Sequence, residues 1–231
     1  MFLKAKNMAR HKKISLTIGL LYLLTFVSIP TVALYSNAKD PGFITSNLTA
    51  TPIFVGGILE VIVAIAGIGT AVMLYGILKK QSEVLSIGLI ASRTLEAAGI
   101  ILGVSFLLTL VTLRDSGIGL EGVAISKALV SLYKNIFLLS QSLMPGINDL
   151  ILGFLLYKTN LVPKIIAKIG IVGGPVLLAG FLAVVLGFTE QNGTIAGLSA
   201  LLVALFEFTL GFWLVFKGFN PMAIKALENK K

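Results

Sequence analysis

Six apolar stretches dominate this sequence of 231 residues, and each is long enough to cross a lipid bilayer. A membrane-spanning helix needs about 20 consecutive apolar residues. The stretches predict an all-α membrane protein with six transmembrane helices. They run approximately from Ile14 to Tyr35, Pro52 to Leu78, Val84 to Leu113, Ile136 to Tyr157, Ile169 to Phe188 and Thr194 to Phe216.

The composition supports the same fold class. Charged residues make up 13% of the chain and the mean hydropathy is +0.97, whereas an ordinary soluble domain carries about 25% charged residues. So few charges cannot cover the surface of a water-soluble protein of this size. Lipid is therefore expected to be the solvent for much of the surface.

The basic residues alternate between the connections and predict the orientation of the helices. Fourteen of them lie in the N-terminal segment, the second and fourth connections and the tail, whereas only Lys39, Arg114, Lys127 and Lys134 are assigned to the other side. Because cytoplasmic loops carry the excess of Lys and Arg, both termini are predicted to be cytoplasmic. The sequence thus divides into a basic segment at 1–13, a six-helix transmembrane bundle at 14–217 and a basic tail at 218–231.

The helices are predicted to form three hairpins in parallel orientation, each entering from the cytoplasm. The odd-numbered helices open with similar triplets, Ile18-Gly19-Leu20, Ile87-Gly88-Leu89 and Ile169-Gly170-Ile171. Duplication of one hairpin explains the likeness, and so does convergent patterning of three similar hairpins. The segment Glu121 to Lys134 is expected to extend the fourth helix, because no glycine or proline separates it from the span; the alternative is a surface helix.

Several chemistries are excluded by what the sequence lacks. Cysteine is absent and His11 is the only histidine, so disulfides, iron–sulfur clusters, thiolate catalysis and multi-histidine metal sites are ruled out. We expect no metal and no cofactor. The net charge of +9 comes without a basic stripe interleaved with aromatic residues, which argues against nucleic-acid binding. No catalytic residue is predicted, although an enzyme using only Asp, Glu, Arg or Tyr stays possible.

Five charged residues fall inside the predicted spans, where each costs several kcal/mol unless it is shielded. They are Glu60, Arg93, Glu96, Asp149 and Glu207. The four acids lie at helical spacing on rows of small residues, such as Gly88, Ser92, Glu96, Gly99 and Gly103. Since small residues let transmembrane helices approach closely, the acids are predicted to face the bundle.

The depths of these residues allow Arg93, Glu96, Asp149 and Glu207 to converge in one layer, whereas Glu60 lies nearer the outer end of its helix. Over all five residues, four acids face one arginine. Uncompensated carboxylates in a medium of low dielectric constant take up protons or attract a cation. We therefore predict a small binding or transport protein with a polar site for a proton, cation or amphipathic ligand. The predicted site consists of Glu60, Arg93, Glu96, Asn148, Asp149 and Glu207.

Two other hypotheses stay open. In one, the charges form a structural network in a non-catalytic membrane component that binds a protein partner or lipid, with homo-oligomers among the possible assemblies. In the other, the chain is an intramembrane enzyme. Met144-Pro145-Gly146 in the fourth helix and Gly173-Gly174-Pro175 in the fifth predict kinks that expose backbone carbonyls, and the first of these lies directly before Asn148 and Asp149.

Three groups of motifs resemble one known family. They are Leu59-Glu60-Val61 followed by 66–71; 91–97, which contains Arg93 and Glu96; and 145–153 followed by Leu161-Val162-Pro163-Lys164. Together they resemble the bacterial integral membrane family catalogued as domain of unknown function 4386, over about residues 12 to 218. The resemblance implies a multi-pass protein of the bacterial plasma membrane, and it brings no catalytic residues. Asp149 departs from the family pattern, where alanine or leucine often follows the asparagine.

Overall fold

The computed structural model describes residues 2–40 and 42–230, and it describes side chains within this range from Arg10 onward. Part of the predicted basic N-terminal segment, including the side chains of Lys4 and Lys6, lies outside the described residues. The same holds for Lys231 in the predicted tail. The contribution of these residues to the predicted orientation therefore rests on the sequence.

Helices are the only regular secondary structure among the described residues, which contain no strand. Among the described residues, six segments are long and apolar enough to cross a membrane, which confirms the predicted number of spans and indicates a multi-pass membrane protein. The long helices are α1 (Phe2–Leu24), α3 (Thr51–Leu78), α4 (Glu83–Asp115), α5 (Gly122–Leu138), α6 (Met144–Thr159), α7 (Lys164–Val185) and α8 (Thr194–Phe216). The short ones are α2 (Thr31–Leu34) and α9 (Pro221–Glu228).

Two spans are not uniform α-helices. The first predicted span ends its α-helix at Leu24 and continues through a 3₁₀ turn at Thr25–Ser28 before α2. The fourth runs without interruption from α5 into α6 through a π-helical segment at Leu139–Leu143, so the region before the span extends the helix as predicted. The last span, Thr194–Phe216, has its predicted bounds.

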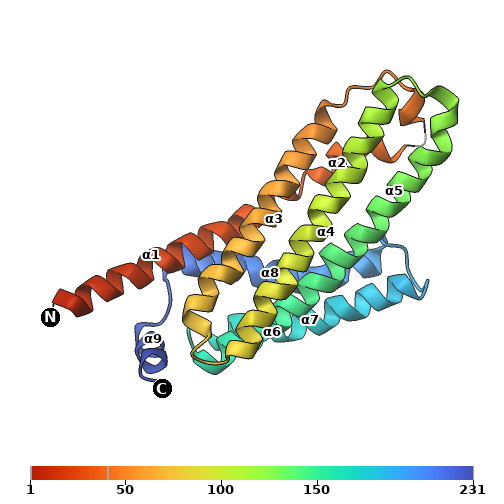
Figure 1. The fold of residues 1–231 in the computed structure, drawn as a ribbon. Coiled ribbons are helices and arrows are strands. Elements are labelled where there is room, and N and C mark those ends of the chain that lie inside the picture. Colours follow the sequence, from red (N-terminus) through yellow and green to blue (C-terminus); the bar gives the residue numbers. More distant parts are fainter. Residues whose placement is uncertain (1, 41, 231) are drawn as a thin grey trace.

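The six spans form a closed ring in the order of the chain. α1 packs on α3, α3 on α4, α4 on α5 and α6, α6 on α7, α7 on α8, and α8 returns to α1. Figure 1 shows α3, α4 and α5 extending together beyond the other helices, toward the connections before α3 and after α4. This arrangement surrounds a central region to which every span can contribute side chains.

Glycines set the closest approaches in the ring. A Cβ atom on Gly153 would lie 2.8 Å from the backbone nitrogen of Ile171 in α7, and one on Gly19 would lie 2.7 Å from the carbonyl oxygen of Gly211 in α8. These contacts bring α6 to α7 and α1 to α8, as expected for small residues between transmembrane helices.

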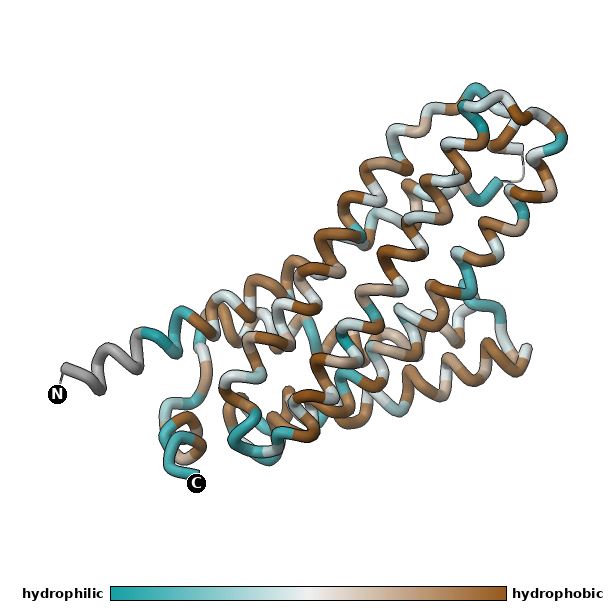
Figure 2. The backbone as a smooth tube through the Cα atoms, in the orientation of Figure 1, coloured by the Kyte–Doolittle hydropathy of each residue, from teal (hydrophilic) through white to brown (hydrophobic). Residues whose placement is uncertain are grey.

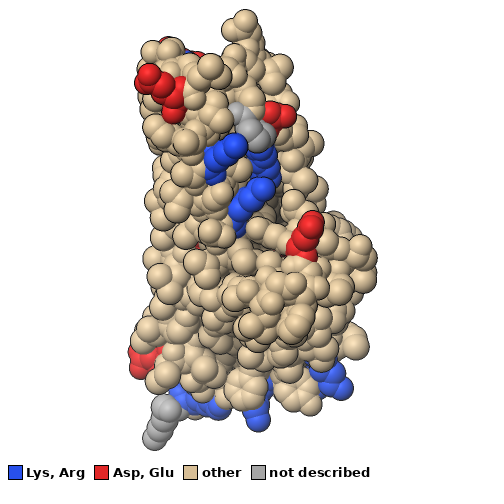
Figure 3. All heavy atoms as spheres, turned by 90° about the vertical axis from the view of Figure 1, so that its right-hand side faces the viewer, with Lys and Arg blue, Asp and Glu red and all other residues tan. Residues whose placement is uncertain are grey.

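The outer surface of the bundle is apolar along most of its length. Large side chains such as Ile58, Ile65 and Leu95 are more than half exposed, which suits contact with lipid. Figure 2 shows hydrophobic residues along the spans and hydrophilic residues mainly at the ends and connections. In the space-filling view, Lys and Arg side chains gather at the lower end of the molecule and in a hollow partway up the face shown (Figure 3).

Candidate functional site

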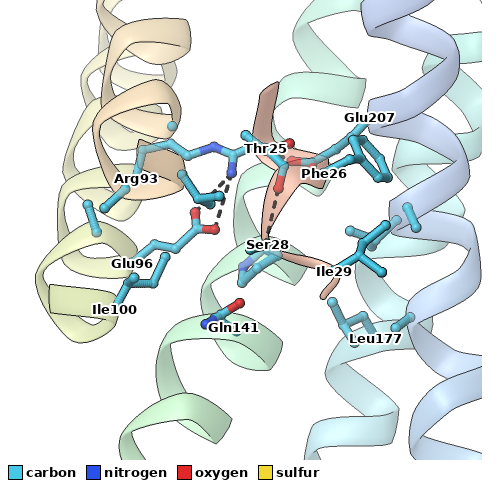
Figure 4. Close-up of a pocket in the computed structure, with 18 residues that line it drawn as sticks. Thr25, Phe26, Ser28, Ile29, Arg93, Glu96, Ile100, Gln141, Leu177 and Glu207 are labelled. Atoms are coloured by element: carbon cyan, nitrogen blue, oxygen red, sulfur yellow. Dashed lines mark hydrogen bonds and ion pairs between the residues drawn. The ribbon is translucent and has the colours of Figure 1, made fainter. Parts of the chain in front are cut away.

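The α-helix of the first span is interrupted where this span borders the centre of the ring. Pro30 has no backbone N–H and therefore cannot continue the α-helical hydrogen bonds of the preceding turn. The carbonyl of Phe26 instead accepts a hydrogen bond from the N–H of Ile29, and the hydroxyls of Thr25 and Ser28 bond to backbone carbonyls one turn earlier. The irregular turn carries Phe26 and Ser28 to the edge of a central cavity (Figure 4).

A second irregularity lies opposite, in the fourth span. Pro145 cannot donate to a carbonyl in the preceding turn, and the π-helical segment Leu139–Leu143 comes directly before it. Such π-bulges are a known cause of bent helices and are frequent at functional sites. Gly99 of α4 permits close contact here, because its Cβ would lie 2.5 Å from the Cβ of Ser140. The helix turn that follows places Asn148 and Asp149 against α4.

Arg93 is the centre of the charged cluster. Its guanidinium is buried, forms an ion pair with Glu96 at 3.0 Å, and donates a hydrogen bond to Glu207. One oxygen of Asp149 lies 3.9 Å from the same guanidinium. The planar guanidinium presents five donors in a fixed fork, so it can join carboxylates from α4, α6 and α8. It also lies over the ring of Tyr22, 5.7 Å from the ring centroid.

Asn148 connects this cluster to Ser92. Its side-chain amide donates to Glu96 at 2.6 Å, and its carbonyl oxygen accepts a hydrogen bond from the Ser92 hydroxyl. Glu96 therefore accepts hydrogen bonds from both Arg93 and Asn148. These interactions join α4 to α6 within the bundle. The structure thus brings together five of the six predicted site residues, Arg93, Glu96, Asn148, Asp149 and Glu207.

Asp149 is the least satisfied member of the cluster. It is fully buried, and neither carboxylate oxygen forms a hydrogen bond with any described residue. Its nearest opposite charge, Arg93, already binds Glu96 and Glu207 at shorter distances. Three carboxylates share one guanidinium, so the cluster has an excess of negative charge if all of them are ionised. Burying an unpaired charge is costly, and the excess favours uptake of a proton or cation.

Arg93, Glu96 and Glu207 of the charged cluster border a cavity of about 190 Å³, large enough for several water molecules. Asn148 and Asp149 are not among the residues that line it. All six spans line it. Figure 4 shows Arg93 and Glu96 at the left with Ile100 below them, Glu207 opposite at the upper right beside Phe26, and Ile29 and Leu177 at the lower right. The cavity is therefore lined by both charged, hydrogen-bonding groups and apolar side chains.

Glu60 lies apart from the other predicted site residues. It is buried, but the groups around it are the hydroxyls of Thr31, Tyr35 and Tyr133 and the ammonium of Lys39. On the same helix, Gly67 is the residue whose Cβ would approach Arg93, at 3.9 Å. Seven residues of α-helix separate Glu60 from this level, about 10 Å along the axis. Glu60 therefore belongs to a second buried cluster.

The sequence patterns do not predict the cavity lining in the first span. Thr25, Phe26 and Ser28 come from the 3₁₀ turn, which lies within a stretch predicted to be one uninterrupted span. Pro30, five residues after Thr25, is the available signal for the break. Across residues 2–40 and 42–230, no group of three or more His, Asp or Glu side chains is placed to hold a metal ion.

Comparison with known families assigns the chain as a whole. A family model described as domain of unknown function (DUF4386) matches residues 17–218. The chain belongs to this family. The match confirms the resemblance found in the sequence, and it extends from within the first span of this DUF4386 protein to just beyond the last. No curated protein and no solved structure matches the chain.

Proposed function

We propose that this DUF4386 protein is a small binding or transport protein whose central cavity takes a cation with an apolar part, in exchange with protons. The observation that carries the proposal is the cavity itself, which is lined by both carboxylates and apolar side chains. A protonated amine with a short hydrocarbon chain matches both kinds of lining. Its ammonium would compensate the negative charge that Arg93 leaves unbalanced, and its chain would contact Phe26, Ile29 and Leu177.

The proposed orientation has both termini in the cytoplasm of a bacterial cell, with three parallel hairpins in its plasma membrane. The basic residues support it, because 14 of the 19 lie in segments assigned to one side, and such an excess marks the cytoplasmic side. In this orientation, the cluster around Glu60 lies closer to the outer face than the Arg93 cluster.

The test uses hexylammonium as the probe and the full chain in nanodiscs. Titration calorimetry at pH 6 and pH 8 should detect saturable binding that is tighter at pH 8, because protons compete for the same carboxylates. Glu207→Gln should weaken binding about tenfold or more, as expected for removal of a charged hydrogen-bond partner. Glu190→Gln, which removes an exposed acid outside the cavity, is the matched control and should bind like the wild type.

Two results would contradict the proposal. One is the absence of saturable hexylammonium binding to the wild type. The other is unchanged binding in a folded Glu207→Gln variant. The second result would favour the alternative function, a non-catalytic membrane component in which the cluster is structural. The hydrogen bond from Asn148 of α6 to Glu96 of α4 is the observation in favour of that alternative, because it connects helices without any ligand.

A further inference from the structure

The C-terminal helix α9 packs against one end of the bundle. It begins after Asn220, whose side chain accepts a hydrogen bond from the N–H of Met222 at 3.0 Å. One face is buried among core residues of the bundle; its residues are Ala223, Ile224 and Leu227. At the end of α9, Glu228 pairs with His11 of α1 at 3.1 Å. Figure 1 shows α9 near α1, at the end that carries the C-terminus.

A cavity of about 700 Å³ lies between α9, the end of α8 and the N-terminal part of α1. It is distinct from the central cavity and shares no lining residue with it. Its apolar lining consists of Phe219, Pro221, Met222 and Ile224. Its charged lining contains three lysines, Lys12, Lys217 and Lys225, together with His11, against the single carboxylate of Glu228.

These two kinds of lining match an amphiphile with an anionic head. The lysines give the cavity a positive charge even when His11 is neutral. Phe219 and Ile224 are buried, whereas Met222 is 79% exposed, so an apolar surface runs from the cavity to the outside. Because the cavity lies at the ends of the spans, it is at the depth where lipid headgroups are found. Basic pockets at this depth suit anionic headgroups.

We propose that this cavity is a binding site for an anionic phospholipid. The phosphate would lie among the lysines, and an acyl chain would lie against Phe219 and Met222. α9 completes the site, because it supplies Met222, Ile224 and Lys225. The site would bind one lipid specifically, in contrast to lipids that surround the whole bundle. It is independent of the central cavity, and neither site requires the other.

Native mass spectrometry of the full chain, released from detergent with a defined lipid, tests the proposal. Phosphatidylglycerol and phosphatidylethanolamine with identical acyl chains are the probes. One phosphatidylglycerol should be retained preferentially. The double variant Lys217→Gln/Lys225→Gln should lower its affinity about twentyfold, since a basic residue near anionic lipid contributes about fivefold. All the replaced side chains are exposed, so the variant is expected to fold.

The matched control is Lys158→Gln/Lys168→Gln, which removes the same charge from segments assigned to the same side, outside this cavity. It should retain phosphatidylglycerol like the wild type. Met222→Gln tests the apolar lining and should weaken binding severalfold without any change in charge. Equal loss in the two lysine variants would overturn the proposal in favour of general attraction to headgroups. Equal retention of phosphatidylethanolamine by the wild type would overturn it as well.

Discussion

The buried acids of this bundle occupy two places with different surroundings. Around Arg93, three carboxylates share a fixed cation, and Glu96 accepts hydrogen bonds from Arg93 and Asn148. Around Glu60, the cation is Lys39, on a short turn outside the spans, and one carboxylate oxygen has no hydrogen-bond partner among the described residues. The first cluster is held by interactions between helices, whereas the cation of the second comes from the connection between two spans.

The two clusters also differ in how they use aromatic rings. Tyr35 and Tyr133 meet edge to face at 5.7 Å, and the Lys39 ammonium lies 6.0 Å and 5.2 Å from their ring centroids. Gly56, one turn before Glu60, leaves room for Tyr35, since its Cβ would lie 2.5 Å from the ring. The Lys39 cation near Glu60 therefore lies against aromatic rings. The cation among Glu96, Asp149 and Glu207 is stabilised mainly by carboxylates. Two equally buried acids can therefore contribute differently to the stability of the fold.

Removal of Arg93 should have the largest effect. Arg93→Leu leaves three buried carboxylates without their cation, and loss of one partner of a buried ion pair costs about 3–5 kcal/mol. The melting temperature in nanodiscs should fall by about 6–20 °C. The fluorescence of Trp213, the only tryptophan, can follow the transition.

The control for this change is Lys168→Leu, which removes one exposed positive charge from α7 and should leave the melting temperature nearly unchanged. Addition of Glu96→Gln and Glu207→Gln to Arg93→Leu should restore part of the stability, because two of the uncompensated charges disappear. If Arg93→Leu has the same melting temperature as the control variant, the guanidinium is not the centre of the cluster.

The sequence alone predicts more of the Arg93 cluster than of the Glu60 cluster. Rows of small residues correctly predicted that Glu60, Glu96 and Asp149 are buried, because a helix face is a local property. Similar depths made convergence of the Arg93 cluster possible, and the depth of Glu60 along its own helix placed it nearer the other end. The order of the helices, and with it the groups that surround Glu60, depends on which helices meet, and no single-helix pattern contains that information. Tyr35 and Tyr133 are nearly 100 residues apart, and only the ring of helices brings them together.

Replacement of one acid in each cluster should lower the stability by an intermediate amount. The two losses allow a direct comparison of the clusters. Glu96→Gln keeps the side-chain volume but places an amide where Arg93 and Asn148 both donate, and hydrogen bonds to charged groups contribute about 1.5–3 kcal/mol each. Glu60→Gln should change the free energy of unfolding by less than about 1 kcal/mol, a typical net value for one neutral hydrogen bond. Thermal melting of both variants in the same lipid measures the two losses of stability. Equal losses would mean that the two acids depend equally on their surroundings.

The smallest effect is expected for Lys39. Lys39→Met keeps an apolar chain against the rings and removes a cation–π contact, which contributes about 0.5–1 kcal/mol at an accessible site. Burial lowers the pKa of the Lys39 ammonium below its ordinary value of 10.5, Glu60 opposes this shift, and Lys134 adds to it. Between the lowered pKa and 10.5, the unfolded chain binds more protons than the folded one, so stability contributed by this group rises with pH. The melting temperature of the wild type should therefore gain slightly relative to Lys39→Met as the pH approaches 10.5. Lys127→Met removes an exposed lysine of α5 and is the control. If the melting temperature of the wild type gained equally relative to Lys127→Met, the effect would not belong to the Glu60 cluster.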